Sequence, residues 1–247
     1  MIGCWCRQPG KTCPFRGCKG NKNIIFAAEM NRRNYQSEMD RLIDELQQAG
    51  RVPTLLLHVC CAPCSSYCLE YLSRYFETTV LFYNPNISPL AEYQKRMDEL
   101  KRFVGEYPFI HPVKVITSDY TPSVFYESVK GLENEPERGR RCHICYRIRL
   151  EETARLAAEN HFDYFATTLT LSPLKDADKL NEIGQEMGKK YRTAYLPSDF
   201  KKKEGYKRSI VLSAQYKLYR QNYCGCVFSK KAIPESSADQ ASQASGI

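Results

Sequence analysis

The chain has 247 residues, 43% of them hydrophobic, and a formal net charge of +8 at neutral pH. No apolar run approaches the roughly 20 residues that span a bilayer and no apolar leader precedes the first cysteines, so we exclude an integral membrane protein and expect a cytoplasmic one. In a reducing compartment, its twelve cysteines indicate metal or redox chemistry more than structural disulfides.

Three segments are expected along the chain. Residues 1–23 show neither helix nor strand periodicity, and their cysteine spacings fit common zinc patterns poorly, so a flexible extension is favoured over a small metal site. The cysteines of this segment are Cys4, Cys6, Cys13 and Cys18. Residues 24–231 are expected to form a single domain, and residues 232–247, rich in Ser, Ala and Gln, a disordered tail.

In the central segment, apolar periodicity predicts helices that alternate with short strands rich in β-branched and aromatic residues. Helices are expected over residues 31–48, 65–75, 88–104, 123–130, 145–159, 176–188 and 209–219, with Ser65 or Ser66, and Ser88, as N-caps. Strands are expected over residues 55–59, 78–83, 112–116 and 162–168. This alternation predicts an α/β fold with a Rossmann-like, doubly wound, mainly parallel sheet and helices on both faces.

The first predicted strand runs directly into three thiols, those of Cys60, Cys61 and Cys64. These thiols would lie at the carboxyl end of a strand and beside the N-terminus of a helix. Open α/β sheets bind ligands at this position, and the backbone N–H groups and helix dipole there favour thiolate over thiol. We therefore expect a metal site at the carboxyl ends of the strands.

Seven cysteines fall into three groups: Cys60, Cys61 and Cys64; Cys142 and Cys145; Cys224 and Cys226. Four thiolates satisfy either a tetrahedral zinc ion or an iron–sulfur cluster, so the metal stays open. The one-residue spacing of the last pair suits reversible oxidation, with a metal-ligand role as the alternative. The neighbouring His58 and His143 are interpreted as core or surface imidazoles, because the thiols already suffice as ligands.

From about Leu55 to Ser229 the chain resembles the epoxyqueuosine reductases of the QueH type. The resemblance is carried by HVCCAPC, YNPNI, EPERGRRCHICY, TTLTLSP and LYRQNYCGCVFS, which begin at residues 58, 83, 135, 167 and 218. It implies the last step of queuosine synthesis, in which epoxyqueuosine at the tRNA wobble position is reduced to queuosine without cobalamin and with electrons from an unidentified donor.

The resemblance also implies roles for the cysteines. Cys60, Cys61, Cys142 and Cys145 match the ligands of a [4Fe–4S] cluster, and Cys224 and Cys226 match a redox-active disulfide. Cys64, together with one of Cys60, Cys224 or Cys226, is the favoured ligand of an additional iron ion, which could act as a Lewis acid on the epoxide oxygen. The reduction needs a proton donor, for which Asp119 and Tyr146 are candidates by position.

Excess positive charge is compatible with a tRNA partner. The residues expected to contact tRNA phosphates are Arg138, Arg140, Arg141, Lys201, Lys202, Lys203, Lys207 and Arg208. The main alternative is a zinc-stabilised RNA-binding module without catalysis, which would be colourless. An ATP-using tRNA-modifying enzyme would need a Gly-rich loop after the first strand, and CCAPC is not one.

Overall fold

The computed structural model of the chain describes residues 33–230. The chain divides into two compact units, Met1–Arg33 and Asn34–Ile247, and the helices and strands below belong to the second. The N-terminal cysteines Cys4 to Cys18 and the tail over residues 232–247 lie outside the described residues, so the expectations for them stay predictions.

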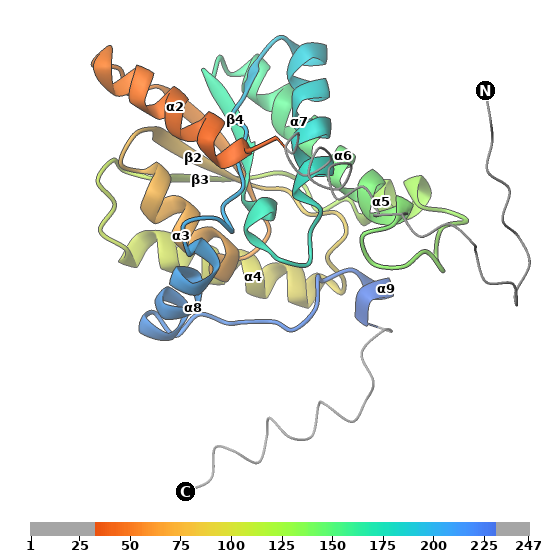
Figure 1. The fold of residues 1–247 in the computed structure, drawn as a ribbon. Coiled ribbons are helices and arrows are strands. Elements are labelled where there is room, and N and C mark those ends of the chain that lie inside the picture. Colours follow the sequence, from red (N-terminus) through yellow and green to blue (C-terminus); the bar gives the residue numbers. More distant parts are fainter. Residues whose placement is uncertain (1–32, 231–247) are drawn as a thin grey trace, which may run out of the picture. The chain divides into compact units, whose positions relative to one another are not determined.

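Five parallel strands form one sheet in the order β3-β2-β1-β4-β5 (Figure 1). The strands are β1 (Thr54–Val59), β2 (Glu77–Phe82), β3 (Lys114–Thr117), β4 (Tyr164–Thr167) and β5 (Ala194–Tyr195). The first strand in the sequence, β1, lies at the centre of the sheet. Strands β2 and β3 follow on one side of it, and β4 and β5 lie on the other side. The connections after β1 and β4 therefore diverge, which creates the switch point where such sheets bind ligands. The predicted α/β fold is confirmed.

Helices cover both faces of this sheet. They are α2 (Tyr35–Gln48), α3 (Ala62–Leu72), α4 (Leu90–Glu106), α5 (Pro122–Ser128), α6 (Arg140–Glu159), α7 (Ala177–Tyr191), α8 (Gly205–Gln215) and α9 (Val227–Lys230), with a 3-10 turn η1 (Thr168–Leu171) after β4. No described helix is both long and apolar enough to cross a membrane.

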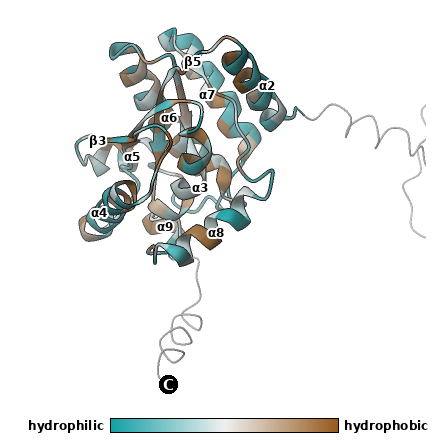
Figure 2. Ribbon diagram, turned by 90° about the vertical axis from the view of Figure 1, so that its left-hand side faces the viewer, coloured by the Kyte–Doolittle hydropathy of each residue, from teal (hydrophilic) through white to brown (hydrophobic). Residues whose placement is uncertain are grey.

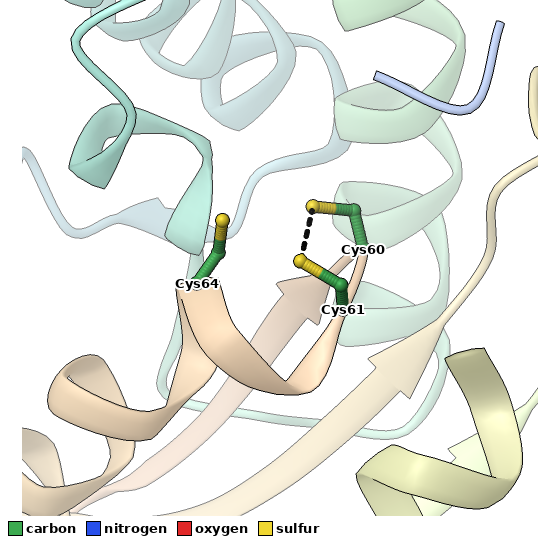
Figure 3. Close-up of side chains that lie close together, drawn as sticks. All are labelled: Cys60, Cys61 and Cys64. Atoms are coloured by element: carbon green, nitrogen blue, oxygen red, sulfur yellow. Dashed lines mark hydrogen bonds between the residues drawn. The ribbon is translucent and has the colours of Figure 1, made fainter. Parts of the chain in front are cut away.

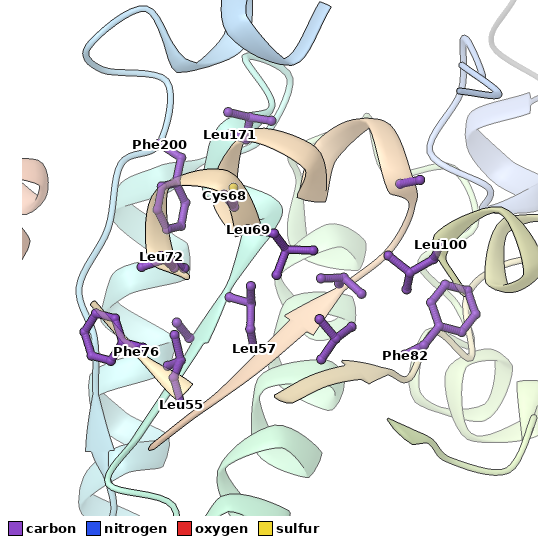
Figure 4. Packing of buried hydrophobic residues seen from close by; sticks show 14 of the residues in the cluster. Leu55, Leu57, Cys68, Leu69, Leu72, Phe76, Phe82, Leu100, Leu171 and Phe200 are labelled. Atoms are coloured by element: carbon purple, nitrogen blue, oxygen red, sulfur yellow. The ribbon is translucent and has the colours of Figure 1, made fainter. Parts of the chain in front are cut away.

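Strand β1 supplies both halves of the core, because successive side chains of a strand point to opposite faces. Leu55, Leu57 and Val59 pack with buried side chains of α2, α3 and α4 (Figure 4). Leu56 packs on the other face with buried side chains of α6 and α7. Burial on both faces explains why the strand is almost continuously apolar. Figure 2 shows α2 banded in hydrophobic and hydrophilic residues, as expected of a helix with one buried side.

Several expected helix starts are wrong, including that of α8, which begins at Gly205 rather than Ser209. Helix α3 begins at Ala62 with Cys61 at its N-cap, and Ser65 and Ser66 lie inside it, where their hydroxyls donate to carbonyls one turn back. Pro63 suits that first turn because its missing N–H would be unpaired there in any case. Helix α4 likewise starts after Pro89 rather than Ser88.

A further correction concerns α6, which begins at Arg140 instead of Cys145. Its first turn is basic and polar, so it shows no apolar periodicity that would extend the prediction toward the N-terminus. Cys142 and Cys145 therefore lie on the first two turns of one helix and on neighbouring positions of its surface. η1, β5 and α9 are too short to give a sequence signal, and all three were missed.

Candidate metal and redox site

A cavity of about 280 Å³ opens at the carboxyl ends of β1 and β4. Its wall comes from the start of α3, from α6, from η1 and the loop after it, from α8, and from the loop that leads to α9. Cys60, Cys61, Cys64 and Cys224 all line it. The topological switch point thus brings together cysteines that are more than 150 residues apart in the sequence.

Cys60, Cys61 and Cys64 form one compact group at the end of β1 (Figure 3). Their sulfur atoms lie within 4.8 Å of one another, and those of Cys60 and Cys61 are 3.8 Å apart. Hydrogen bonding to Cys61 raises the pKa of Cys60 to about 11, and hydrogen bonding to Cys60 raises the pKa of Cys64. The same contacts lower the pKa of Cys61. The group therefore favours one thiolate, on Cys61, and thiolates are the form that binds metal.

The second group lies on α6. Cys142 is half-buried, packs against the same apolar cluster as Cys60, and accepts a hydrogen bond of 3.3 Å from the backbone N–H of Arg138. Cys145 is buried, and burial raises the pKa of its thiol to about 12. Among the described residues, neither thiol belongs to the 4.8 Å group of Cys60, Cys61 and Cys64.

The third group, Cys224 and Cys226, consists of free thiols on a fixed loop. Arg96 Nη1 donates to the Cys224 carbonyl at 3.2 Å, and the backbone N–H of Ser88 donates to the Gly225 carbonyl at 3.0 Å. Gly225 has a φ of +95°, and a Cβ there would lie 3.0 Å from Arg96 Nη1. Only glycine adopts this backbone conformation so close to Arg96 without strain.

Three buried cations border the cavity: Arg96, Arg149 and Lys175, which are 1%, 1% and 8% exposed. Arg96 pairs with Glu92 at 2.7 Å. No carboxylate among the described residues pairs with Arg149, and one terminal nitrogen of each arginine has no hydrogen-bond partner there. Uncompensated buried charge is costly, so the cavity favours anionic groups.

Arg149 connects the three cysteine groups electrostatically. Burial alone would lower its pKa, but neighbouring thiols raise it, and they come from all three groups: Cys145, Cys224 and Cys60. The guanidinium therefore lies where the groups converge. Sequence reasoning missed Arg96, Arg149 and Lys175. The only signal that we find is that Lys175 follows the TTLTLSP motif.

Most of the predicted phosphate-binding residues already have partners in the chain. Arg141 is buried, and its Nη1 donates to the carbonyls of Leu132, Glu133 and Glu135, so it is not available to a phosphate. Four others are ion-paired: Lys201 with Asp199, Lys203 with Asp40, Lys207 with Glu204 and Arg208 with Glu70. Arg138, Arg140 and Lys202 are exposed and have no ion pair among the described residues.

The two candidate proton donors differ in position. Asp119 is exposed in the loop after β3 and does not line the cavity. Tyr146 is 1% exposed, and its hydroxyl has no hydrogen-bond partner within residues 33–230. His58 is buried between Thr167 Oγ1 at 3.0 Å and the Tyr83 carbonyl at 3.1 Å, as expected of a core histidine.

Comparison with known proteins identifies the family. The model of the family described as epoxyqueuosine reductase QueH matches residues 55–232. The chain belongs to this family. The epoxyqueuosine reductase QueH of Streptococcus pyogenes is 44% identical to this chain over 200 residues, which covers 80% of this chain and 78% of the relative. One from Staphylococcus epidermidis is 43% identical over 211 residues, covering 83% and 89%.

One solved structure that aligns with this QueH-family chain is much more distant in sequence. The U34-tRNA thiolase NcsA from Methanococcus maripaludis, solved with its [4Fe-4S] cluster, aligns with a TM-score of 0.46. It is 15% identical over 78% of this chain and 67% of that one, which is too distant to bear on function.

The residues of this QueH-family chain fit a thiolate-bound metal centre. Soft thiolates are the ligands of zinc, iron and iron–sulfur clusters. Two sulfur ligands on one tetrahedral ion with bonds of about 2.3 Å lie about 3.8 Å apart. The sulfur atoms of Cys60 and Cys61 have that spacing, which fits two ligands of one ion. In a [4Fe–4S] cluster each iron takes one thiolate, so these two sulfur atoms would have to move apart to hold one. The buried cations would offset the negative charge of several thiolates, so the surroundings fit such a group as well.

Proposed function

We propose that this QueH-family protein is an oxidoreductase that reduces epoxyqueuosine to queuosine at the wobble position of tRNA, without cobalamin. The observation that carries the proposal is the presence of thiols from separate chain segments, with buried cations, on one cavity. The curated relatives bear the name of this reductase.

The cysteines of α6 and of the β1–α3 connection would hold the metal. Cys60, Cys61, Cys142 and Cys145 are the proposed ligands of a [4Fe–4S] cluster, and Cys64 is the proposed ligand of an additional iron. When bound, the cluster would supply electrons one at a time, and the additional iron would supply a Lewis acid.

Reducing an epoxide to an alkene removes its oxygen as water and takes up two electrons and two protons. The dithiol of Cys224 and Cys226 can supply two electrons and two protons by closing to a disulfide, which an external donor must then reduce. Cys224 lines the cavity, so the dithiol has access to a bound substrate. Neither candidate proton donor, Tyr146 or Asp119, lines the cavity; Tyr146 lies on α6 with Cys142 and Cys145, whereas Asp119 is exposed in the loop after β3.

Docking of the tRNA would depend on exposed cations that are not already paired. Arg138, Arg140 and Lys202 meet this condition, whereas the ion-paired residues of the Lys201–Arg208 stretch would have to exchange partners. Contacts to phosphate position a nucleic acid but carry little base information.

The test is anaerobic purification of the full chain, with iron and sulfide counts and an absorption spectrum, followed by turnover of epoxyqueuosine-containing tRNA. We expect a brown protein with a four-iron cluster that Cys142→Ser loses, and a Cys224→Ser variant that keeps the cluster but loses turnover. A colourless zinc protein that binds tRNA without turnover would favour the RNA-binding module instead.

A further inference from the structure

The two thiols of the Cys224–Gly225–Cys226 loop occupy different environments. Cys224 is half-buried and lines the cavity. Cys226 is 7% exposed, does not line the cavity, and packs in an apolar cluster with Phe125, Val129 and Cys145. A substrate in the cavity can therefore reach the first thiol and not the second.

A buried ammonium group also distinguishes the two thiols. Lys175 Nζ donates to Cys224 Sγ at 3.3 Å and to Glu137 Oε1 at 2.9 Å. The Lys175 side chain is only 8% exposed, whereas Glu137 is 37% exposed. Because Glu137 is more exposed than Cys224, water screens its charge more strongly. The interaction of the ammonium group with Cys224 is therefore the less screened of the two.

The charge of Lys175 depends on these neighbours. Burial by itself would lower the pKa of Lys175, but Cys224 and Glu137 raise it above its ordinary value. The lysine therefore stays an ammonium at neutral pH, and it donates a hydrogen bond to the Cys224 sulfur. No comparable cation donates a described hydrogen bond to Cys226.

We propose that Cys224 is the substrate-facing thiol of the redox pair, that Lys175 is a positioning residue whose ammonium group fixes the Cys224 sulfur by a hydrogen bond, and that Cys226 is the buried partner. This rests on the proposed function, in which the pair reduces the epoxide. As the S–S bond forms, the two cysteines give up two electrons and two protons in total. The breaking C–O bonds take up those electrons, and the oxygen leaves as water with both protons.

The experiment measures alkylation of the anaerobic, cluster-loaded full chain by limiting iodoacetamide between pH 6 and 9, with peptide mass spectrometry to locate the label. We expect Cys224 to be labelled before Cys226. Lys175→Met should slow labelling of Cys224 at pH 7 by about tenfold, because the sulfur loses the cation that donates to it at 3.3 Å. Lys175→Arg keeps the charge and should keep the rate within about twofold.

Lys179→Met is the matched control, because Lys179 lies on α7, does not line the cavity and pairs with Glu182 at 2.7 Å. It should label as the unmodified chain does. Faster labelling of Cys226 than of Cys224 in the unmodified chain would overturn the proposal without need of any variant. So would an unchanged rate in Lys175→Met, or protection of Cys224 that a chelator removes, since the latter would make it a metal ligand.

The labelling experiment and the reductase assay test different claims. If epoxyqueuosine-containing tRNA is not turned over while the labelling order and its dependence on Lys175 hold, the proposed function fails and the assignment of the two thiols stands. If turnover occurs but Lys175→Met labels normally, the reductase stands and the positioning role is wrong.

Discussion

Two groups of basic residues in this protein differ in how their charge is matched. Around the cavity, Arg96, Arg149 and Lys175 are buried and lie beside thiols. Along the segment that leads into α8, cations such as Lys203 and Arg208 are about half exposed, and carboxylates pair with them. Exposed pairs are screened by water, whereas a buried charge must be matched by its surroundings. The two groups therefore differ in burial and in the partners that match their charge, and not in basicity.

The sharpest test of this contrast is Arg149→Met. Removing the cation should weaken iron retention about 10- to 100-fold, the usual effect of losing a group that supports metal ligands. The metal-free protein should be as stable as before or more stable, because a buried charge without a carboxylate partner is replaced by an apolar side chain. Iron per chain after a chelator challenge and urea unfolding measure the two effects.

Arg147→Met provides the control on the same helix, since Arg147 is 40% exposed and pairs with Glu186 at 2.6 Å. It should leave iron retention unchanged. Equal iron loss in the Arg147 and Arg149 variants would remove the distinction between the two kinds of cation.

A second test acts on the loop that Arg96 holds. Gly225→Ala should lower the free energy of unfolding of the metal-free protein by about 1–3 kcal/mol, because φ is +95° and the new Cβ would press on the guanidinium. Gly105→Ala in α4 meets no atom within 4 Å and should stabilise by up to about 1 kcal/mol. Urea unfolding that ranks these two variants in the reverse order would contradict the geometry of the loop.

A third test compares the contributions of two exposed lysines, Lys202 and Lys203, to tRNA binding. Lys202→Ala should reduce the slope of log affinity for tRNA against log salt by about 0.7 to 0.9, the value of one phosphate contact. Lys203→Ala should change it less, because Lys203 is already paired with Asp40 at 2.7 Å. Binding titrations at several salt concentrations measure both, and a larger effect at Lys203 would show that its ion pair opens on binding.

The smallest expected effect is a pH dependence from the exposed region. Arg208 lowers the pKa of Glu70 below its ordinary 4.5, so the pair stabilises the fold above that value and the contribution is lost as pH falls through the lowered pKa. Because Arg208 is 42% exposed, the contribution should stay below about 1 kcal/mol. Unfolding free energies at pH 7 and pH 3 should differ by less in Glu70→Gln than in the unmodified chain.

The central strand and its thiols could be predicted from the sequence because an apolar run followed by CCAPC carries both signals at once. The start of α6 could not, since Arg140 and Arg141 show no apolar periodicity and a helix in a protein is stabilised mainly by packing. The roles of Lys175 and Arg149 were equally inaccessible. Isolated lysines and arginines are almost always exposed, and only the folded chain shows these two enclosed beside thiols.

The switch point also has a consequence for the order in which the site assembles. Its parts come from β1, from the start of α6 and from the segment before α9, and the contact of Arg96 with the Cys224 carbonyl joins residues 128 positions apart. Contacts of such long sequence separation form late in folding, after local ones. The proposed cluster ligands are all synthesised before Cys224, so on the proposed function a metal centre could be complete in a chain whose redox pair is not yet in place.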